Sequence, residues 1–164
     1  PFLLCISDLC GNLNDVKKIF NEIEPEIVIH MAAQPLVRES YENPHYTYET
    51  NVMGTVNICE CIRTSNCVKS FLNVTTDKVY ENKEKQEGYK EDEKLDGFDP
   101  YSNSKSCSEI ITHSYNNSFF KEMTSSFFCI NPFKYEKSNL YSLGILNSSI
   151  LASPMFLIIL STSP

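Results

Sequence analysis

The sequence predicts a single α/β domain in which helices pack against an open parallel sheet. Short runs rich in β-branched and aromatic residues alternate along the chain with stretches in which apolar residues recur at helical spacing. That alternation is typical of a parallel sheet with crossover helices. A chain of 164 residues that is 41% hydrophobic can bury one core of this kind, and nothing in it suggests two complete domains.

The start of the chain contains the first strand, helix and second strand of this pattern. Residues 2–6 form an apolar run, and the stretch 13–23 has a helical periodicity that ends before Pro25. The run from Ile27 to Met31 is apolar and rich in β-branched residues, as expected for a strand buried on both faces of a parallel sheet.

The middle of the chain continues the alternation. After a polar loop, apolar spacings of three and four predict a helix over 48–62 that packs against the sheet. Residues 71–74 are predicted to form the next strand. The charged stretch 81–99 is predicted to be an exposed loop.

A further helix is predicted to begin at Tyr101. Pro100 precedes it in the place that proline favours at a helix start, although the helix is rich in Ser and Asn, which are poor helix formers. A strand is expected over 125–130. The core-facing stripe of the helix is expected to consist of Ile110, Ile111, Tyr115 and Phe119.

Composition narrows the possible ligands. The formal net charge of -7, with basic residues spread among acids, argues against a nucleic-acid partner and favours a small ligand. Seven cysteines without a Cys-x-x-Cys pair indicate neither a zinc site nor a disulfide framework, so they are interpreted as reduced thiols in the cytosol. Because no cationic segment stands before the first strand, we expect no signal sequence, and because the stretch 140–160 is interrupted too often, we expect no membrane helix there.

Tyr101 and Lys105 are the clearest candidates for catalytic residues. Four residues apart on a helix, they are neighbours on one face, with about 5 to 6 Å between Cβ atoms. We expect the ammonium to stabilise phenolate and so to bring the phenol pKa down from about 10 toward the range of a general base. Such a pair also arises by chance in a chain with nine tyrosines, so an exposed pair without a role is an equal alternative for these two residues alone.

A second polar set follows the strands. The triplet Thr76-Asp77-Lys78 comes directly after the strand at 71–74 and supplies a hydroxyl, a carboxylate and an amine. Because ligands bind at the carboxyl ends of parallel strands, this triplet should converge with Asp8 and with the segment from Ala32 to Gln34. The alternatives are that Asp8 only offsets a helix macrodipole and that the two alanines only pack.

Together these motifs resemble the extended short-chain dehydrogenases/reductases, and within that family the CDP-glucose 4,6-dehydratases. The resemblance runs from Asp8 to Phe120 and is carried by the segments 25–38, 50–55, 76–82 and 99–105. Sugar-nucleotide epimerases are similar more distantly. dTDP-glucose dehydratases carry Glu where this chain has Lys78, so that lysine, with Gln34-Pro35, favours the CDP-sugar branch.

The resemblance implies a Rossmann-like fold, a nucleotide-sugar substrate and a tightly held NAD that is reduced and reoxidised within one turnover. It assigns Tyr101 as the base for the C4 hydroxyl proton, and Lys105 as the residue that holds the phenolate and binds the nicotinamide ribose. Thr76 is assigned to the C4 oxygen. Asp77 and Lys78 share the acid and base roles in the loss of water across C5 and C6, in an order that stays open.

The resemblance also implies cofactor contacts away from the reacting carbon, and homo-oligomers for full-length members of the family. Arg38 is a further candidate, with a surface cation as its equal alternative. The implied contacts are Asp8 and Leu9 near the adenine, Ala32, Ala33 and Gln34 along the pyrophosphate and ribose, Thr50 as a second contact, and Tyr101 with Lys105.

The chain departs from the family pattern at both ends. None of its five glycines forms the glycine-rich turn of the family's first strand, so we expect weakened NAD binding. Downstream of Phe120 the family's substrate lobe is not recognisable. We therefore expect a fragment, with 1–130 as a partial NAD-binding domain and 131–164 as a divergent tail; another sugar-nucleotide epimerase or dehydratase and a non-catalytic remnant are the alternatives.

Overall fold

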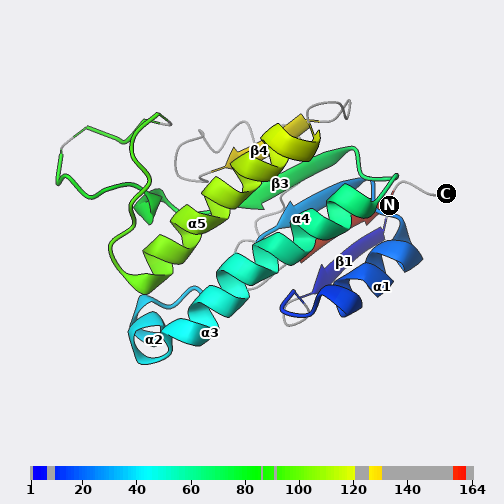
Figure 1. Ribbon diagram of the computed structural model, residues 1–164, viewed down its shortest axis with the longest axis horizontal. Coiled ribbons are helices and arrows are strands. Elements are labelled where there is room, and N and C mark those ends of the chain that lie inside the picture. The colour runs from blue at the N-terminus through cyan, green and yellow to red at the C-terminus, as the bar shows by residue number, and fades with distance from the viewer. Residues whose placement is uncertain are drawn as a thin grey trace.

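In the computed structural model, the strands that are described form one sheet in the order β1-β5-β2-β3-β4 (Figure 1). The structure describes residues 10–120 apart from residues 86 and 91, together with the backbone of three further strands. The strands are β1 (Phe2–Ile6), β2 (Ile27–His30), β3 (Ser70–Val74), β4 (Ser126–Ile130) and β5 (Leu157–Ser161).

The parallel α/β prediction is confirmed for the central strands. β2 and β3 run parallel, with His30 opposite Asn73, and β3 and β4 run parallel, with Val74 opposite Ile130. β5, which falls in the expected divergent tail, differs because it lies between β1 and β2 and pairs antiparallel with both. Pairing across such a sequence separation leaves no periodic signal, so the sequence shows an apolar run there but not its neighbours. The rest of 131–164 lies outside the described residues.

Helices connect the parallel strands, and α4 and α5 run side by side across the sheet (Figure 1). None of the helices that the structure describes has both the length and the apolar character needed to cross a bilayer. The helices are α1 (Leu13–Ile23), α2 (Val37–Glu42), α3 (Pro44–Tyr48), α4 (Gly54–Thr64) and α5 (Pro100–Tyr115), with π-helical turns η1 (Glu49–Met53) and η3 (Asn116–Phe120) and a 3₁₀ turn η2 (Asp77–Val79).

The start of α5 is fixed by its sequence as predicted. Pro100 occupies the first turn, and the side chain of Asp99 accepts a hydrogen bond from the backbone N–H of Ser102 at 3.0 Å. This cap satisfies one of the N–H groups that a helix start leaves without an intrahelical partner. The position of Tyr101 at the beginning of the helix follows from it.

Two helical segments differ from the sequence prediction. The predicted helix 48–62 is part of a longer helical stretch that begins at Pro44 and contains the π-helical turn η1 before α4. The predicted polar loop before it contains α2. A helix as short as α2 has too few turns for apolar periodicity to reveal it.

The hydrophobic core lies between the sheet and the helices. Phe71 of β3 is 1% exposed and Phe120, which follows α5, is 1% exposed. Cys10, Cys59 and Cys61 are buried in the core, and Cys59 is fully buried. The other core side chains include Val16, Phe20, Val28, Ile58 and Ile62.

The inner face of α5 is hydroxylic rather than apolar. Ile110 is 53% exposed and Phe119 is 51% exposed, so the expected stripe through these residues is wrong at both positions, although Ile111 and Tyr115 do pack against the core. The fully or almost fully buried stripe of α5 is Ser104, Ser108 and Thr112, spaced four residues apart.

Hydrogen bonds explain why these small polar residues face inward. Ser108 Oγ donates to the carbonyl oxygen of Asn51 at 2.9 Å, and Thr55 Oγ1 lies 3.1 Å from Ser108 Oγ. Asn73 Nδ2 of β3 donates to Thr112 Oγ1 at 2.9 Å. Each hydroxyl has a partner, so its burial does not carry the cost of an unsatisfied polar group.

This arrangement predicts opposite sensitivities for two neighbouring positions of α5. Ser108→Ala should lower the free energy of unfolding by about 1 to 2 kcal/mol, because it leaves buried partners unsatisfied. Ile110→Ser, at an exposed site, should change it by less than about 0.5 kcal/mol. Urea unfolding followed by circular dichroism measures both; a larger loss for Ile110→Ser would restore the apolar stripe expected from the sequence.

Candidate active site

The carboxyl ends of β2 and β3 bring two of the predicted segments to one edge of the sheet. Ala32 to Gln34 follow β2, Thr76 to Lys78 follow β3, and the two strands are hydrogen-bonded neighbours. The predicted convergence is therefore confirmed for these segments. Asp8 and Leu9 lie outside the described residues, so their predicted contacts with the adenine stay predictions.

Tyr101 lies against the triplet that follows β3. The hydroxyl of Thr76 hydrogen-bonds the phenol of Tyr101, and the charge of Asp77 acts on the same phenol. Thr76 is 7% exposed, and its hydroxyl also lies 3.1 Å from a carboxylate oxygen of Asp77. Asp77 and Lys78 are exposed at the site. The structure thus joins the two sequence motifs in one place.

The pKa of Tyr101 is raised above its ordinary value, which contradicts the expected depression by Lys105. Burial of the phenol is the main cause, and the negative charges of Asp77 and Asp99 add to it. The hydrogen bond between Tyr101 and Thr76 lowers the pKa of the phenol and so acts in the opposite direction. In this structure the phenol is therefore protonated at neutral pH.

Lys105 shares a face of α5 with Tyr101 but is directed at the sheet. It is 4% exposed, and its Nζ donates to the carbonyl oxygen of Val74, the last residue of β3, at 3.0 Å. This contact ties α5 to the strand that carries the Thr76 triplet. It also explains why the ammonium does not favour ionisation of the phenol here.

Gln34 is buried in a closed turn that Asn51 holds. Its backbone N–H donates to Asn51 Oδ1 at 2.7 Å, its carbonyl accepts from Asn51 Nδ2 at 3.1 Å, and its own Nε2 donates to Thr47 Oγ1 at 2.8 Å. Asn51 Nδ2 also donates to Ser104 Oγ of α5 at 2.9 Å. Thr50, the predicted second cofactor contact, precedes Asn51 in η1 and is half-buried.

Asn51 is therefore a site residue that the sequence reasoning missed. It joins the turn after β2, the π-helical turn η1 and the helix of Tyr101. The signal was present, because Asn51 lies inside the Thr50-Asn51-Val52-Met53-Gly54 motif, but the motif alone does not show an inward-facing amide. Its role is to hold the turn after β2 and α5 in register. Arg38, by contrast, is exposed and its Nε lies 3.2 Å from Glu42, as expected for a surface cation.

His30 lies beneath the site, at the end of β2, and was also missed. It is 1% exposed, and its Nε2 is 3.2 Å from Thr55 Oγ1. Burial, followed by the positive charge of Lys105, lowers the pKa of His30 to about 3. The imidazole is consequently neutral wherever the protein is folded near neutral pH, and the charge of Lys105 reaches it.

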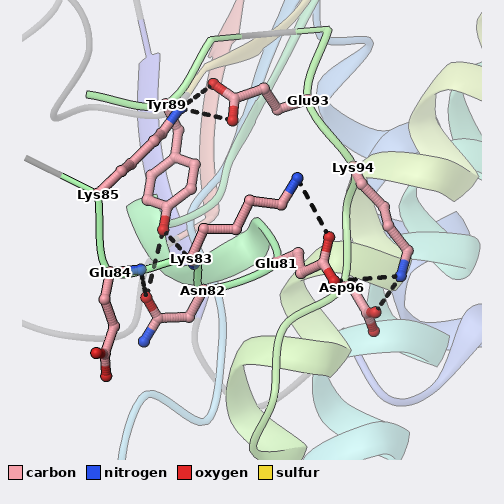
Figure 2. Close-up of polar contacts among 9 residues, drawn as sticks. All are labelled: Glu81, Asn82, Lys83, Glu84, Lys85, Tyr89, Glu93, Lys94 and Asp96. Atoms are coloured by element: carbon pink, nitrogen blue, oxygen red, sulfur yellow. Dashed lines mark hydrogen bonds and ion pairs between the residues drawn. The ribbon is translucent and has the colours of Figure 1, made fainter. Parts of the chain in front are cut away.

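Ion pairs join several described residues of the predicted exposed loop 81–99 (Figure 2). Lys85 Nζ contacts both carboxylate oxygens of Glu93, at 2.5 and 2.6 Å, and lies over the ring of Tyr89. Lys94 lies between Asp96, at 2.7 Å, and Glu81, at 3.8 Å (Figure 2). These pairs give an exposed segment a defined shape beside the site, although each contributes little to stability on its own.

The loop and the start of α5 enclose a hollow of about 880 Å³ next to Asp77 and Lys78. Aromatic side chains contribute to its wall, and Tyr80 and Tyr89 are stacked with ring centroids 5.4 Å apart. Among the described residues that line it, Lys78 is the one basic residue. The lining residues include Asp77, Glu81, Asp96 and Asp99 as carboxylates, Tyr80, Tyr89 and Phe98 as aromatic residues, and Ser102 and Asn103 from α5.

Gly97 fits the loop to α5 closely. A Cβ atom at this position would overlap the backbone of Ser102, and the backbone N–H of Gly97 donates to Ser106 Oγ at 3.1 Å. Ser106 Oγ in turn donates to the carbonyl oxygen of Val79 at 2.7 Å. The loop is therefore attached to the helix that carries Tyr101.

Comparison with known proteins gives a family for this arrangement. The family model described as GDP-mannose 4,6 dehydratase matches residues 3–140. The chain is 48% identical over 130 residues to the CDP-glucose 4,6-dehydratase of Salmonella typhimurium, covering 77% of this chain and 33% of that protein. It is 31% identical over 113 residues to the CDP-paratose 2-epimerase of Salmonella typhi, covering 60% of this chain and 33% of that protein. The chain thus spans about a third of the length of these relatives.

Solved structures share the fold. The UDP-glucose 4-epimerase of Thermus thermophilus, solved with NAD, superposes with a TM-score of 0.67 at 24% identity over 77% of this chain and 39% of that one. The dTDP-glucose 4,6-dehydratase of Streptomyces venezuelae, solved with NAD, gives a TM-score of 0.65 at 22% identity over 73% of this chain and 35% of that one. The Rossmann-like fold class predicted from the sequence is confirmed.

The buried His30 predicts a pH dependence of stability. The unfolded chain takes up a proton on His30 near pH 6.5, whereas the folded chain does so only near pH 3. The unfolded state therefore binds more protons between these values, and the free energy of unfolding should fall by about 1.4 kcal/mol per pH unit as the pH drops.

Urea unfolding between pH 7 and pH 5 measures this slope. His30→Gln should remove the part of this slope that one proton accounts for. Equal slopes for the wild type and His30→Gln would show that His30 titrates normally in the folded protein.

Proposed function

This chain belongs to the GDP-mannose 4,6-dehydratase family of extended short-chain dehydrogenases/reductases, and on that premise we propose that it carries the reaction site of an NAD-dependent nucleotide-sugar 4,6-dehydratase. The proposed substrate is CDP-glucose and the proposed product CDP-4-keto-6-deoxyglucose, which makes the enzyme a lyase of deoxysugar biosynthesis for surface polysaccharide. The proposed compartment is the cytosol, where the free cysteines stay reduced. One observation carries the proposal: Thr76 and Tyr101, from the two sequence motifs, are hydrogen-bonded to each other beside Asp77.

The residues at the strand ends fit the ribose end of NAD. An ammonium carries three hydrogens and a phenol one, so Lys105 and Tyr101 form a donor set suited to sugar hydroxyl oxygens. Ala32 and Ala33, which follow β2, are 2% and 6% exposed, and their contacts with the pyrophosphate and ribose stay part of the proposal. When bound, NAD would supply the oxidation of C4 and the later reduction.

The chain's own groups supply proton transfer and positioning. Tyr101 accepts the proton of the C4 hydroxyl, and Thr76 hydrogen-bonds the same oxygen. Oxidation at C4 acidifies the C5 proton, so loss of water across C5 and C6 needs one group to accept that proton and another to donate to the departing hydroxyl. Asp77 and Lys78 are adjacent and exposed at the site, which supports this pair of roles.

The hollow beside Asp77 suits a hexose better than a diphosphate. Four carboxylates line it against one lysine, which disfavours an anionic group. Carboxylates accept hydrogen bonds from sugar hydroxyls, amides both accept and donate them, and aromatic faces pack against sugar C–H surfaces. We therefore place the sugar ring on the Asp77 side and the diphosphate outside the hollow.

A sugar-nucleotide epimerase is the second candidate, supported by the epimerase relatives. The reaction products separate the two functions, because a dehydratase releases water from the sugar and an epimerase keeps every atom. Mass spectrometry of CDP-glucose after incubation with the chain and NAD should detect the product that has lost one water. An isomer of unchanged mass would favour the epimerase.

Tyr101→Phe tests the base assigned to the first step. It should lower the rate of product formation by about 10² to 10⁴-fold, the usual contribution of a positioned general base. Tyr41→Phe, which alters a side chain that is 60% exposed and does not line the hollow, should keep the wild-type rate. A Tyr101→Phe protein with full activity would remove the assigned role.

Calorimetry with NAD separates an active fragment from a non-catalytic remnant. Binding by the wild-type chain, weakened by Lys105→Met, would support the assigned ribose contact. The remnant alternative predicts no heat with either protein.

A further inference from the structure

Helix α5 places a third ionisable residue in line with Tyr101 and Lys105. Glu109 lies four residues beyond Lys105, so the three side chains share one face of the helix at successive turns. Glu109 is half-buried, and its Oε1 accepts a hydrogen bond from the hydroxyl of Thr75. Thr75 is 6% exposed and immediately precedes Thr76.

The two contacts of this face hold one strand end. Lys105 donates to the carbonyl oxygen of Val74, and Glu109 accepts from the side chain of the next residue, Thr75. Between them they attach α5 to the two residues before Thr76, whose hydroxyl reaches the phenol of Tyr101. The position of that hydroxyl therefore depends on both attachments.

The negative charge of Glu109 bears on the buried ammonium of Lys105. A buried ammonium is costly unless an anion lies within reach, and Lys105 is 4% exposed. Glu109 is the one carboxylate on α5, which is described over its whole length, and its Cβ is about 5 to 6 Å from that of Lys105 by helix geometry. On the same face, Tyr101 lies one helical turn before Lys105, and the charge of Lys105 also acts on the neutral His30.

We propose that Glu109 is a positioning residue that fixes the end of β3 through Thr75 and supplies the negative charge that holds the Lys105 ammonium in place. This inference deepens the proposed function, because it concerns the same tyrosine and lysine. Its test measures Lys105 in the ligand-free chain. The result for Lys105 is therefore independent of whether the chain binds NAD, so failure of this inference and failure of the proposed function can be told apart.

Two substitutions separate the charge of Glu109 from its hydrogen bond. Glu109→Gln keeps an oxygen that accepts from Thr75 but removes the charge, whereas Thr75→Val removes the hydroxyl and keeps the charge. NMR of chains labelled at lysine ¹³Cε gives the pKa of Lys105, with its resonance assigned by its absence in Lys105→Arg. Glu109→Gln should lower that pKa by about one unit, Glu109→Asp should restore most of it, and Thr75→Val should leave it near the wild-type value.

Controls and a wild-type measurement keep the outcome decisive. Glu22→Gln, at an exposed glutamate of α1, should not move the Lys105 resonance. In the wild-type chain the Lys105 ¹³Cε shift should show a step where Glu109 titrates, which needs no substitution and so does not depend on a variant that folds. A Lys105 pKa unchanged in Glu109→Gln, or a wild-type titration without that step, would overturn the proposal.

Discussion

The site depends on a seam of buried hydrogen bonds between α5 and the helical stretch that ends in α4. Apolar contacts would let a helix rotate about its axis with little loss, but hydrogen bonds are directional and a buried polar group left without a partner costs about 1 to 3 kcal/mol. Ser104 and Ser108, which bond Asn51 in that stretch, therefore fix the rotation of α5, and Thr112 adds a hydrogen bond to Asn73 of β3. Once that rotation is fixed, the direction of Tyr101 and Lys105 is fixed as well.

The three faces of α5 have distinct tasks, which explains its unusual composition. Ser104 and Ser108 face the neighbouring helix, Ser106 faces the loop through the carbonyl of Val79, and Tyr101 with Lys105 faces the strand end. Serine is a poor helix former because its hydroxyl competes for backbone groups. Here each of these hydroxyls has a defined partner. Hydrogen bonds from α5 to neighbouring segments therefore offset the low helix propensity of serine.

Asn51 extends the seam from α5 to β2. One amide group hydrogen-bonds both main-chain polar groups of Gln34 and the hydroxyl of Ser104. Asn51 lies in a π-helical turn, which widens the helix locally and re-aims the side chains within it. The ends of β2 and β3 are thereby held together from two sides, by Asn51 through α5 and by the ladder between the strands themselves.

Features set by neighbouring residues could be predicted from the sequence, whereas contacts between segments that are far apart in the chain could not. The start of α5 at Pro100 and the order of strands and helices follow from caps, periodicity and topology, and the meeting of Tyr101 with Thr76 follows from the family resemblance. The inward face of α5 could not be predicted in this way. A sequence shows the spacing of the serines, but not that Asn51 will be their hydrogen-bond partner. The insertion of β5 between β1 and β2 and the direction of Lys105 were beyond such reasoning for the same cause.

Because the pKa of Tyr101 is raised, the phenolate needs further stabilisation before Tyr101 can act as a base at neutral pH. Burial favours the neutral phenol, Thr76 alone among the described groups shifts it the other way, and Thr76 also faces Asp77. Hydrogen bonding from one hydroxyl does not outweigh desolvation together with nearby carboxylates. The remaining cation on the same face is Lys105, whose ammonium is directed at Val74. A general base at neutral pH therefore requires that ammonium to turn toward the phenol, and the groups that hold it at the strand end set how readily it does so.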